Sequence, residues 1–361
     1  MLPPEIQRIV LLIGLAAVGY LLILAWTEDM EAAKAPMVYS DSPVLSQQPL
    51  AAQSDRPVVD EFAPVNSDIA PMPQAPVTQP AVGKGRLVKV ETPVLEVWID
   101  LLGGDIARVQ LPTYPISLEQ PDTPFLLMDR SASRTYIAQS ALIGSDGIDK
   151  TGARPLYEAA SDSLTLSEGG ELVLTTTLDD ARVSKIFAFE PESHLINIRY
   201  EVVNLATRSK TMRLLTQIKR DRLPPPTDET VPLAPSPYLG GALTTPDNNY
   251  KKVDFDDLDE GNFQASAIGG WMAFLQHYFL TAWVAPSDQT TNYLARKTSD
   301  GFYLFGFTGQ NQSIQPGATG IWRADFYAGP KDQVVLETIA PYLNLTVDYG
   351  FLWWIAIPLF K

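Results

Sequence analysis

The densest group of potential metal ligands is an acidic segment, residues 254–262, that reads DFDDLDEGN. A calcium-binding loop needs oxygen ligands at alternate positions, a glycine at the sixth position and a bidentate glutamate at the twelfth. Counted from Asp257, Gly261 falls on a ligand position and Asn262 on the glycine position, while Ile268 stands where the glutamate belongs. The pattern therefore predicts a solvated loop and no metal site.

Few residues are available for catalysis by histidine, because the chain has only two histidines, His194 and His277. His194 follows Pro191 at a predicted hairpin turn, and we expect it to be solvated. His277 lies in a strand-like run, WMAFLQHYFLTAW, and is expected to be a core residue. There it should share one apolar face with Trp271, Ala273, Leu275 and Phe279. The chain contains no G-x-S-x-G, no phosphate-binding glycine loop and no H-E-x-x-H, so no catalytic site is predicted.

The composition narrows the possible partners. The net charge of −15, from 27 basic and 42 acidic residues among 361, disfavours nucleic acid, whose phosphates require Lys and Arg. It also disfavours adsorption of the body of the chain to anionic lipid heads. The absence of cysteine excludes disulfides, thiolate-bound metals and thiol catalysis. No cofactor is expected.

An uncharged run near the start of the chain, residues 9–26, reads IVLLIGLAAVGYLLILAW. At ~1.5 Å per residue it nearly spans a hydrocarbon core of ~30 Å, and Trp26 at its end suits the membrane interface. Arg8 precedes the run, whereas Glu28 and Asp29 follow it. Residues 1–26 are therefore predicted to be a cytoplasmic N-terminus and a transmembrane anchor helix, with the rest of the chain exported.

The alternative is a cleaved signal peptide, since Ala33, Lys34 and Ala35 resemble a cleavage site. We favour the anchor because the apolar run exceeds the ~7–15 residues of a signal-peptide core. Residues 27–85 then change composition, with prolines recurring among Ala, Gln, Ser and Val. Proline removes a backbone donor and disfavours helix, so this segment is predicted to be a disordered linker.

Residues 86–330 show a two-residue hydrophobic period, which is typical of antiparallel strands with one buried face. In one such run Leu95, Val97 and Ile99 alternate with Glu96, Trp98 and Asp100, and the second set is expected to face water. Two further runs alternate around residues 196–203 and 322–327, with Tyr327 on the predicted polar face. Turn signals separate the runs at residues 103–105, 168–170, 190–193, 299–301 and 315–317. A large two-sheet β sandwich is predicted.

The last two segments differ from the body. Residues 331–347 carry apolar side chains at helical spacing, which predicts a short amphipathic helix packed on the sandwich or on the membrane. Residues 348–361 read DYGFLWWIAIPLFK, too short to span a bilayer, and are predicted to be an interfacial segment leading to a second transmembrane helix. The predicted membrane-interface residues are Trp26, Tyr349, Trp353, Trp354 and Phe360.

The chain resembles the YidC/Oxa1 family of membrane protein insertases, in its Gram-negative form. The resemblance is visible at residues 103–115 (GGDIARVQLPTYP) and 154–157 (RPLY), and it is stronger at 245–258 (TPDNNYKKVDFDDL) and 269–283 (GGWMAFLQHYFLTAW). It is strongest at 343–361, LNLTVDYGFLWWIAIPLFK, so it covers nearly the whole chain.

The resemblance implies a periplasmic β-super-sandwich of the galactose-mutarotase type and an inner-membrane location. It also implies an insertase and chaperone that assists insertion and folding of inner-membrane proteins, without a cofactor. The implied partners are the Sec translocon with its accessory subunits, nascent inner-membrane proteins and the lipid bilayer. The family inserts through a hydrophilic groove with an arginine on its second transmembrane helix, and no residue here matches that arginine. We therefore expect this chain to be the anchor and periplasmic domain without the insertase core.

Two alternatives remain. The chain could be a membrane-anchored periplasmic interaction module, which is compatible with the insertase hypothesis. A sugar-active, epimerase-like enzyme is the other, and it would need an acid and a base in one cleft. The discriminating observation is whether His194 or His277 pairs with a carboxylate.

Overall fold

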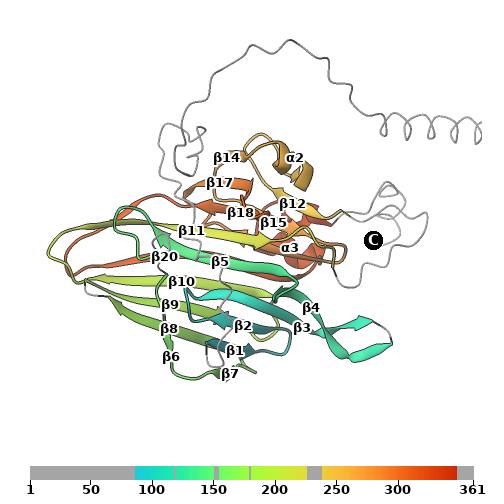
Figure 1. The fold of residues 1–361 in the computed structure, drawn as a ribbon, viewed down its shortest axis with the longest axis horizontal. Coiled ribbons are helices and arrows are strands. Elements are labelled where there is room, and N and C mark those ends of the chain that lie inside the picture. The colour runs from blue at the N-terminus through green and yellow to red at the C-terminus, as the bar shows by residue number, and fades with distance from the viewer. Residues whose placement is uncertain (1–85, 118, 150–153, 179, 226–237, 348–361) are drawn as a thin grey trace, which may run out of the picture. The chain divides into compact units, whose positions relative to one another are not determined.

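The computed structural model describes residues 86–117, 119–149, 154–178, 180–225 and 238–347. The chain divides into two units, Met1–Glu61 and Phe62–Lys361, and the first lies wholly outside the described residues. The described part is mainly β and forms two large sheets (Figure 1).

The eleven-stranded sheet takes its strands from both halves of the domain. Its order is β14 (Phe263–Ile268), β17 (Thr290–Lys297), β18 (Tyr303–Thr308), β11 (Lys210–Arg220), β5 (Thr135–Ile143), β4 (Gln120–Arg130), β3 (Asp105–Ser117), β2 (Glu96–Asp100), β1 (Leu87–Glu91) and β7 (Ser163–Thr165), with β19 (Gln312–Ile314) paired to β11. Among the described strands, β1 and β7 form the parallel pair.

The nine-stranded sheet is antiparallel throughout the described residues. Its order is β13 (Lys251–Val253), β12 (Gly240–Leu243), β15 (Trp271–Leu275), β16 (Phe279–Val284), β20 (Thr319–Pro330), β10 (Leu195–Asn204), β9 (Ala181–Phe189), β8 (Gly170–Leu178) and β6 (Glu158–Ala159).

One hydrophobic cluster joins the inner faces of the two sheets. Val97 and Ile99 of β2 belong to it together with Phe187 of β9 and Ile198 of β10. Alternate residues along a strand point to opposite faces, so the two-residue period selects this set. The prediction of a mainly β, two-sheet sandwich is confirmed.

The predicted alternation fails at the end of β2. Asp100 was expected to face water, but its side chain is completely buried. The register of β2 against β3 shifts between Trp98 and Ile99, but the extra residue, Ala107, belongs to β3, so Asp100 keeps its place opposite to Ile99 and is buried by its partners. The buried carboxylate accepts hydrogen bonds from Arg86 at 2.6 Å and from Arg130. Burial raises the pKa of Asp100, but the two guanidinium groups outweigh burial and lower it overall.

A second cluster covers the outer face of the nine-stranded sheet. Helix α3 (Gln333–Ile339) and the 3-10 helix η1 (Leu343–Thr346) bury Leu336 and Leu343 against the outer side chains of β15 and β16. The Trp271 indole N–H donates to the Pro341 carbonyl at 2.9 Å, and the Asp332 carboxylate accepts from two backbone amides at the start of α3. A helix is therefore present in the predicted segment and packs on the sandwich, but it is limited to Gln333–Ile339, is followed by a separate 3-10 helix, and is buried through Leu336.

The packing of α3 and η1 on this face explains a second residue whose predicted exposure was wrong. Tyr327 of β20 was placed on the polar face, but it is buried in the cluster under α3. Its hydroxyl donates to the Pro330 carbonyl at 2.6 Å. No helix within the described residues has the length and hydropathy of a membrane span. The predicted anchor helix, residues 1–26, lies outside those residues.

We predict that Leu336 anchors α3 to the sheet. In residues 86–347 expressed alone, Leu336→Ala should lower the free energy of unfolding by ~2–5 kcal/mol, because it leaves a cavity beside Trp271. Val334→Ala in the same helix is the control, since Val334 is 75% exposed, and should change it by at most ~0.5 kcal/mol. Urea unfolding followed by circular dichroism measures both. Equal effects, or a largely helical spectrum, would contradict the packing described here.

Candidate functional site

A cleft of about 780 Å³ opens where β10 begins and β20 ends. Its volume falls within the ~300–1,000 Å³ of small-molecule sites, so it is the natural place to look for chemistry. Its wall combines aromatic rings, prolines and carboxylates: Pro93, Tyr114, Ser167, Glu168, Glu190, Pro191, Glu192, Ser193, His194, Tyr327, Pro330, Asp332 and Val335.

His194 is the one histidine of this cleft. It lies in the turn before β10, as predicted, but it is half-buried rather than solvated. Its ring lies 6.3 Å from that of Tyr114 and 6.2 Å from that of Tyr327. Gly329 of β20 makes the space, because a Cβ atom there would come within 2.6 Å of the His194 ring. The tyrosines cover the imidazole, and this tertiary contact is the reason the prediction of exposure was wrong.

The geometry of His194 does not suit acid–base catalysis. Burial lowers the pKa of His194 to about 4, so the ring is neutral at pH 7. Its Nε2 atom is buried and has no hydrogen-bond partner among the described residues. Of the carboxylates in the cleft, that of Asp332 already caps α3. Glu168, Glu190 and Glu192 also line the cleft, and within the described residues no hydrogen bond joins the His194 ring to a carboxylate.

His277 is placed differently from the prediction. The run WMAFLQHYFLTAW is not one strand but a hairpin, in which Gln276 donates its backbone N–H to Phe279 at 2.9 Å. His277 and Tyr278 occupy the two-residue turn and are exposed, with their rings stacked 3.9 Å apart. Trp271, Ala273 and Leu275 do share one face, but Phe279 lies in the inner core because the turn interrupts the alternation.

The acidic segment is a short helix rather than a loop. Helix α2 (Phe255–Glu260) buries Phe255 and Leu258 in the main core, a pattern hidden by the carboxylates between them. Arg222 pairs with Asp256 at 2.5 Å and with Asp259 at 3.2 Å on the exposed side. Within the described residues, no group of three or more acidic or histidine side chains is arranged to hold a metal ion.

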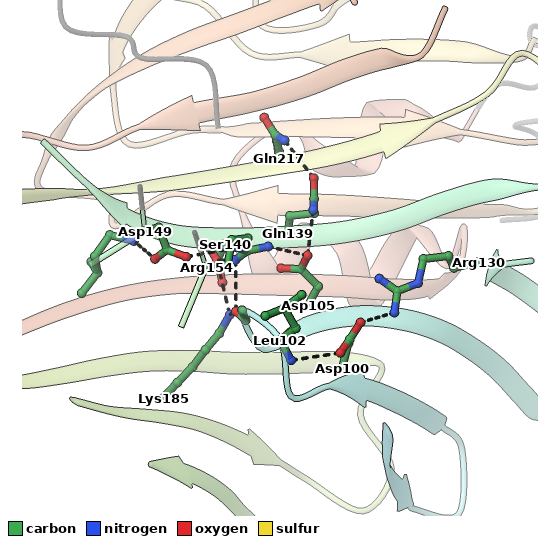
Figure 2. A network of polar contacts seen from close by, with 12 residues as sticks. Asp100, Leu102, Asp105, Arg130, Gln139, Ser140, Asp149, Arg154, Lys185 and Gln217 are labelled. Carbon is green, nitrogen blue, oxygen red and sulfur yellow. Dashed lines mark hydrogen bonds and ion pairs between the residues drawn. The ribbon is translucent and has the colours of Figure 1, made fainter. Parts of the chain in front are cut away.

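Several buried charges of the domain form a network where β3, β5 and β9 meet (Figure 2). The Arg154 guanidinium pairs with Asp105 at 2.5 Å and Asp149 at 3.1 Å, and all three side chains are at most 6% exposed. It also donates to the carbonyls of Gly103 and Ser140. Burial lowers the pKa of Arg154, but the two carboxylates outweigh burial and raise it overall.

Lys185 extends this network to the opposite sheet. It belongs to β9 of the nine-stranded sheet, and its ammonium donates to the carbonyls of Gly103 and Ser140 at 3.0 and 3.4 Å. Its Nζ atom lies 5.0 Å from the Tyr200 ring centroid, where a cation is attracted by the π system. Burial lowers the pKa of Lys185 to about 7, although Asp105 counteracts the shift. The lysine thus links the two sheets.

A glycine pair makes the network sterically possible. Gly103 and Gly104 have φ values of 80° and 64°, in the left-handed region that favours glycine. A Cβ atom at Gly103 would come within 2.2 Å of Arg154, and one at Gly104 within 2.7 Å of Lys185. Two segments that carried the family resemblance, residues 103–115 and 154–157, therefore meet here.

The network was not predicted from the sequence, although one signal pointed to it. Lys185 stands in β9 on the alternation of Ala181, Val183, Phe187 and Phe189, all of which are buried. A lysine on an apolar face implies a buried partner. The predicted membrane-interface residues, Trp26, Tyr349, Trp353, Trp354 and Phe360, lie outside the described residues.

We predict a large loss of stability for Arg154→Ala. Removing the guanidinium leaves Asp105 and Asp149 as uncompensated buried charges, which should cost ~3–5 kcal/mol in urea unfolding of residues 86–347. The control is Arg199→Ala, because Arg199 pairs with Glu201 at the surface of β10, and it should cost at most ~1 kcal/mol. A cost for Arg154→Ala no larger than the control would contradict the role of the network.

We predict that His194 contributes to acid sensitivity. Its folded pKa of about 4 lies below its ordinary value of 6.5, so the unfolded state binds more protons between these values. Stability from this group is complete above pH 6.5 and is lost as the pH falls toward 4. His194→Gln should therefore flatten the fall in unfolding free energy over that window, whereas His277→Gln, at the exposed turn, should leave it unchanged. An unchanged slope in His194→Gln would contradict the burial of the ring.

Comparisons with known proteins agree on one family. The family model of the YidC periplasmic domain matches residues 87–361. A protein of Cellvibrio japonicus (strain Ueda107) is 40% identical over 358 residues, which cover 98% of this chain and 63% of that protein. One of Azotobacter vinelandii is 40% identical over 367 residues, covering 99% and 64%. Both are named membrane protein insertase YidC. The chain thus spans less than two thirds of the length of these relatives.

Solved structures add less. A galactose mutarotase-like protein from Lactobacillus casei is 10% identical and covers 67% of this chain and 99% of its own, with a TM-score of 0.45. A putative aldose 1-epimerase from Escherichia coli is 13% identical and covers 67% and 98%, with a TM-score of 0.38. These scores are too low to support any conclusion. The family model and the relatives suffice, and the chain belongs to the YidC family of membrane protein insertases.

Proposed function

We propose that this chain supplies the membrane anchor and the periplasmic domain of an insertase that assists the insertion and folding of inner-membrane proteins. The observation that carries the proposal is 40% identity over 98% of the chain to a protein named membrane protein insertase. The His194 ring of the cleft is neutral at pH 7 and its Nε2 has no hydrogen-bond partner among the described residues, which is consistent with a function in docking rather than in sugar chemistry.

The parts of the chain take these roles in order. Residues 1–26 anchor the chain with the N-terminus in the cytoplasm, and residues 27–85 are the linker. Residues 86–330 form the periplasmic sandwich, a super-sandwich of the galactose-mutarotase type, and residues 331–347 form the helical segment that covers its outer face. Residues 348–361 lie at the membrane interface through Tyr349, Trp353, Trp354 and Phe360. Trp26, at the end of the anchor, lies at the interface as well. The partners are nascent inner-membrane proteins, the lipid bilayer and the Sec translocon with its accessory subunits.

The proposal that this chain anchors but does not insert substrate follows from the cost of burying polar groups in lipid. An unpaired backbone group costs several kcal/mol there, and a charge costs more, so an insertase needs polar groups within the membrane. Residues 9–26 contain no Asp, Glu, Lys, Arg or His, and neither do residues 351–360. These segments can hold the chain at the bilayer, but they have no charged group that could bind a hydrophilic substrate tail.

We predict that a chimera will insert substrate while this chain alone will not. In the chimera, this chain replaces the matched segment of the Cellvibrio japonicus relative, and insertion of a single-span protein into liposomes is measured. The chimera should act like the intact relative, whereas this chain alone should give no insertion above protein-free liposomes. A folded but inactive chimera would contradict the proposed function. Insertion by this chain alone would show that the anchor and the domain carry the activity themselves.

A further inference from the structure

Exposed apolar side chains of the domain gather in one corner. Eleven large hydrophobic residues are exposed within the described part of the chain, and five of them come from the β15–β16 turn, α3, η1 and the residue before η1. These five, termed the apolar corner below, are Tyr278, Val334, Val335, Tyr342 and Leu345. Scattered exposed hydrophobic residues are ordinary, but a group of them marks a surface that binds protein or membrane.

Backbone contacts hold the corner together. The Lys331 N–H donates to the Tyr278 carbonyl at 2.9 Å, which ties the β15–β16 turn to the start of α3. Helix α3 and η1 share the cluster that buries Leu336 and Leu343. The corner therefore rests on the sheet and is not a loose loop.

The helix presents Val334 away from this packed side. Two residues along an α-helix correspond to ~200° of rotation, so Val334 points nearly opposite to Leu336. Val334 is 75% exposed and Tyr278 is 67% exposed. The ring of Tyr278 is stacked on that of His277 at the turn, which adds a second amphipathic ring to the exposed surface.

The chemistry of the corner and the sequence that follows it both point to lipid. Three charged residues, Lys331, Asp332 and Glu337, are present among residues 331–347, in a chain whose net charge is −15. Leu345 stands four residues before Tyr349, so at ~3.3–3.6 Å per residue the two lie within ~14 Å of each other. Tyr349 begins the apolar, tryptophan-containing segment proposed above to lie at the membrane interface, and tyrosine rings suit the headgroup level.

We infer that the apolar corner docks on the outer surface of the lipid bilayer and sets the orientation of the domain over the membrane. The inference rests on the proposed function, because it requires that residues 1–26 and 348–361 hold the chain at a bilayer. Tyr278 and Tyr342 then contact the headgroup region, and Val334 and Leu345 reach the boundary of the acyl chains. A chain anchored through its ends alone would leave the domain free to turn.

The test uses the absence of cysteine in the full chain. Single variants Tyr278→Cys and Val334→Cys carry a fluorophore in phosphatidylcholine nanodiscs that contain a lipid spin-labelled near the headgroup. Both positions are exposed, so the substitutions leave the core intact. The matched control is Leu205→Cys, since Leu205 is 48% exposed and follows the far end of β10, a ten-residue strand that begins beside Tyr327. At ~3.3 Å per residue, β10 places Leu205 ~30 Å from the corner.

We expect quenching at positions 278 and 334 to exceed that at 205 by at least about threefold, because an apolar face at an interface lies within ~5–10 Å of the headgroup boundary. It should persist in 1 M salt, since docking of this kind does not depend on charge. Equal quenching at the three positions in chains that enter the nanodisc would overturn the inference alone. If the apolar corner becomes buried only after a translocon is added, its partner is a protein and the inference of docking on lipid is overturned. Failure of the chain to enter nanodiscs would overturn the proposed anchoring and the inference with it.

Discussion

The buried ion pairs of Arg154 with Asp105 and Asp149 are the constraint on which the rest of the domain depends. Charges removed from water are tolerated only when each is paired and its remaining hydrogen-bonding groups are satisfied. Arg154 meets this condition by binding two carboxylates and two backbone carbonyls at once. Those carbonyls also receive Lys185 from the opposite sheet. The turn geometry, the inter-sheet contact and the glycines at 103 and 104 are therefore consequences of one polar network.

A second consequence of the architecture is that the nine-stranded sheet is buried on both faces at one end. Met272 and Phe274 point into the core between the sheets, whereas Trp271 and Ala273 point outward beneath α3 and η1. The outer layer completes the fold and lies directly before residues 348–361 in the sequence. The packing of Leu336 and Leu343 thus links the sandwich to the part of the chain proposed to reach the membrane.

The relatives show the family of this chain, whereas its described cleft shows no hydrogen bond between a histidine and a carboxylate. The cleft beside His194 has the volume of a ligand site but presents a neutral histidine whose Nε2 has no hydrogen-bond partner in the described part of the chain. Similar folds carry unrelated functions, so a sandwich architecture says nothing about sugar chemistry. The exposed apolar corner, which precedes residues 348–361 in the sequence, underlies the docking inferred above.

The sequence by itself determined the β class, the turns between strands, the family and the helix after Pro330, because alternation, turn residues and helical spacing are local properties. Tertiary structure decided which side chains have a burial different from the one that those patterns predict. Asp100 and Lys185 are buried because guanidinium groups and carbonyls from other parts of the chain pair with them. Tyr327 is covered by a helix that follows it, and His194 by two tyrosines. His277 is exposed because a hairpin turn replaces the strand that its apolar neighbours predicted. Each of these outcomes depends on residues distant in sequence or on a turn that the hydrophobic pattern conceals, so no local period could have shown it.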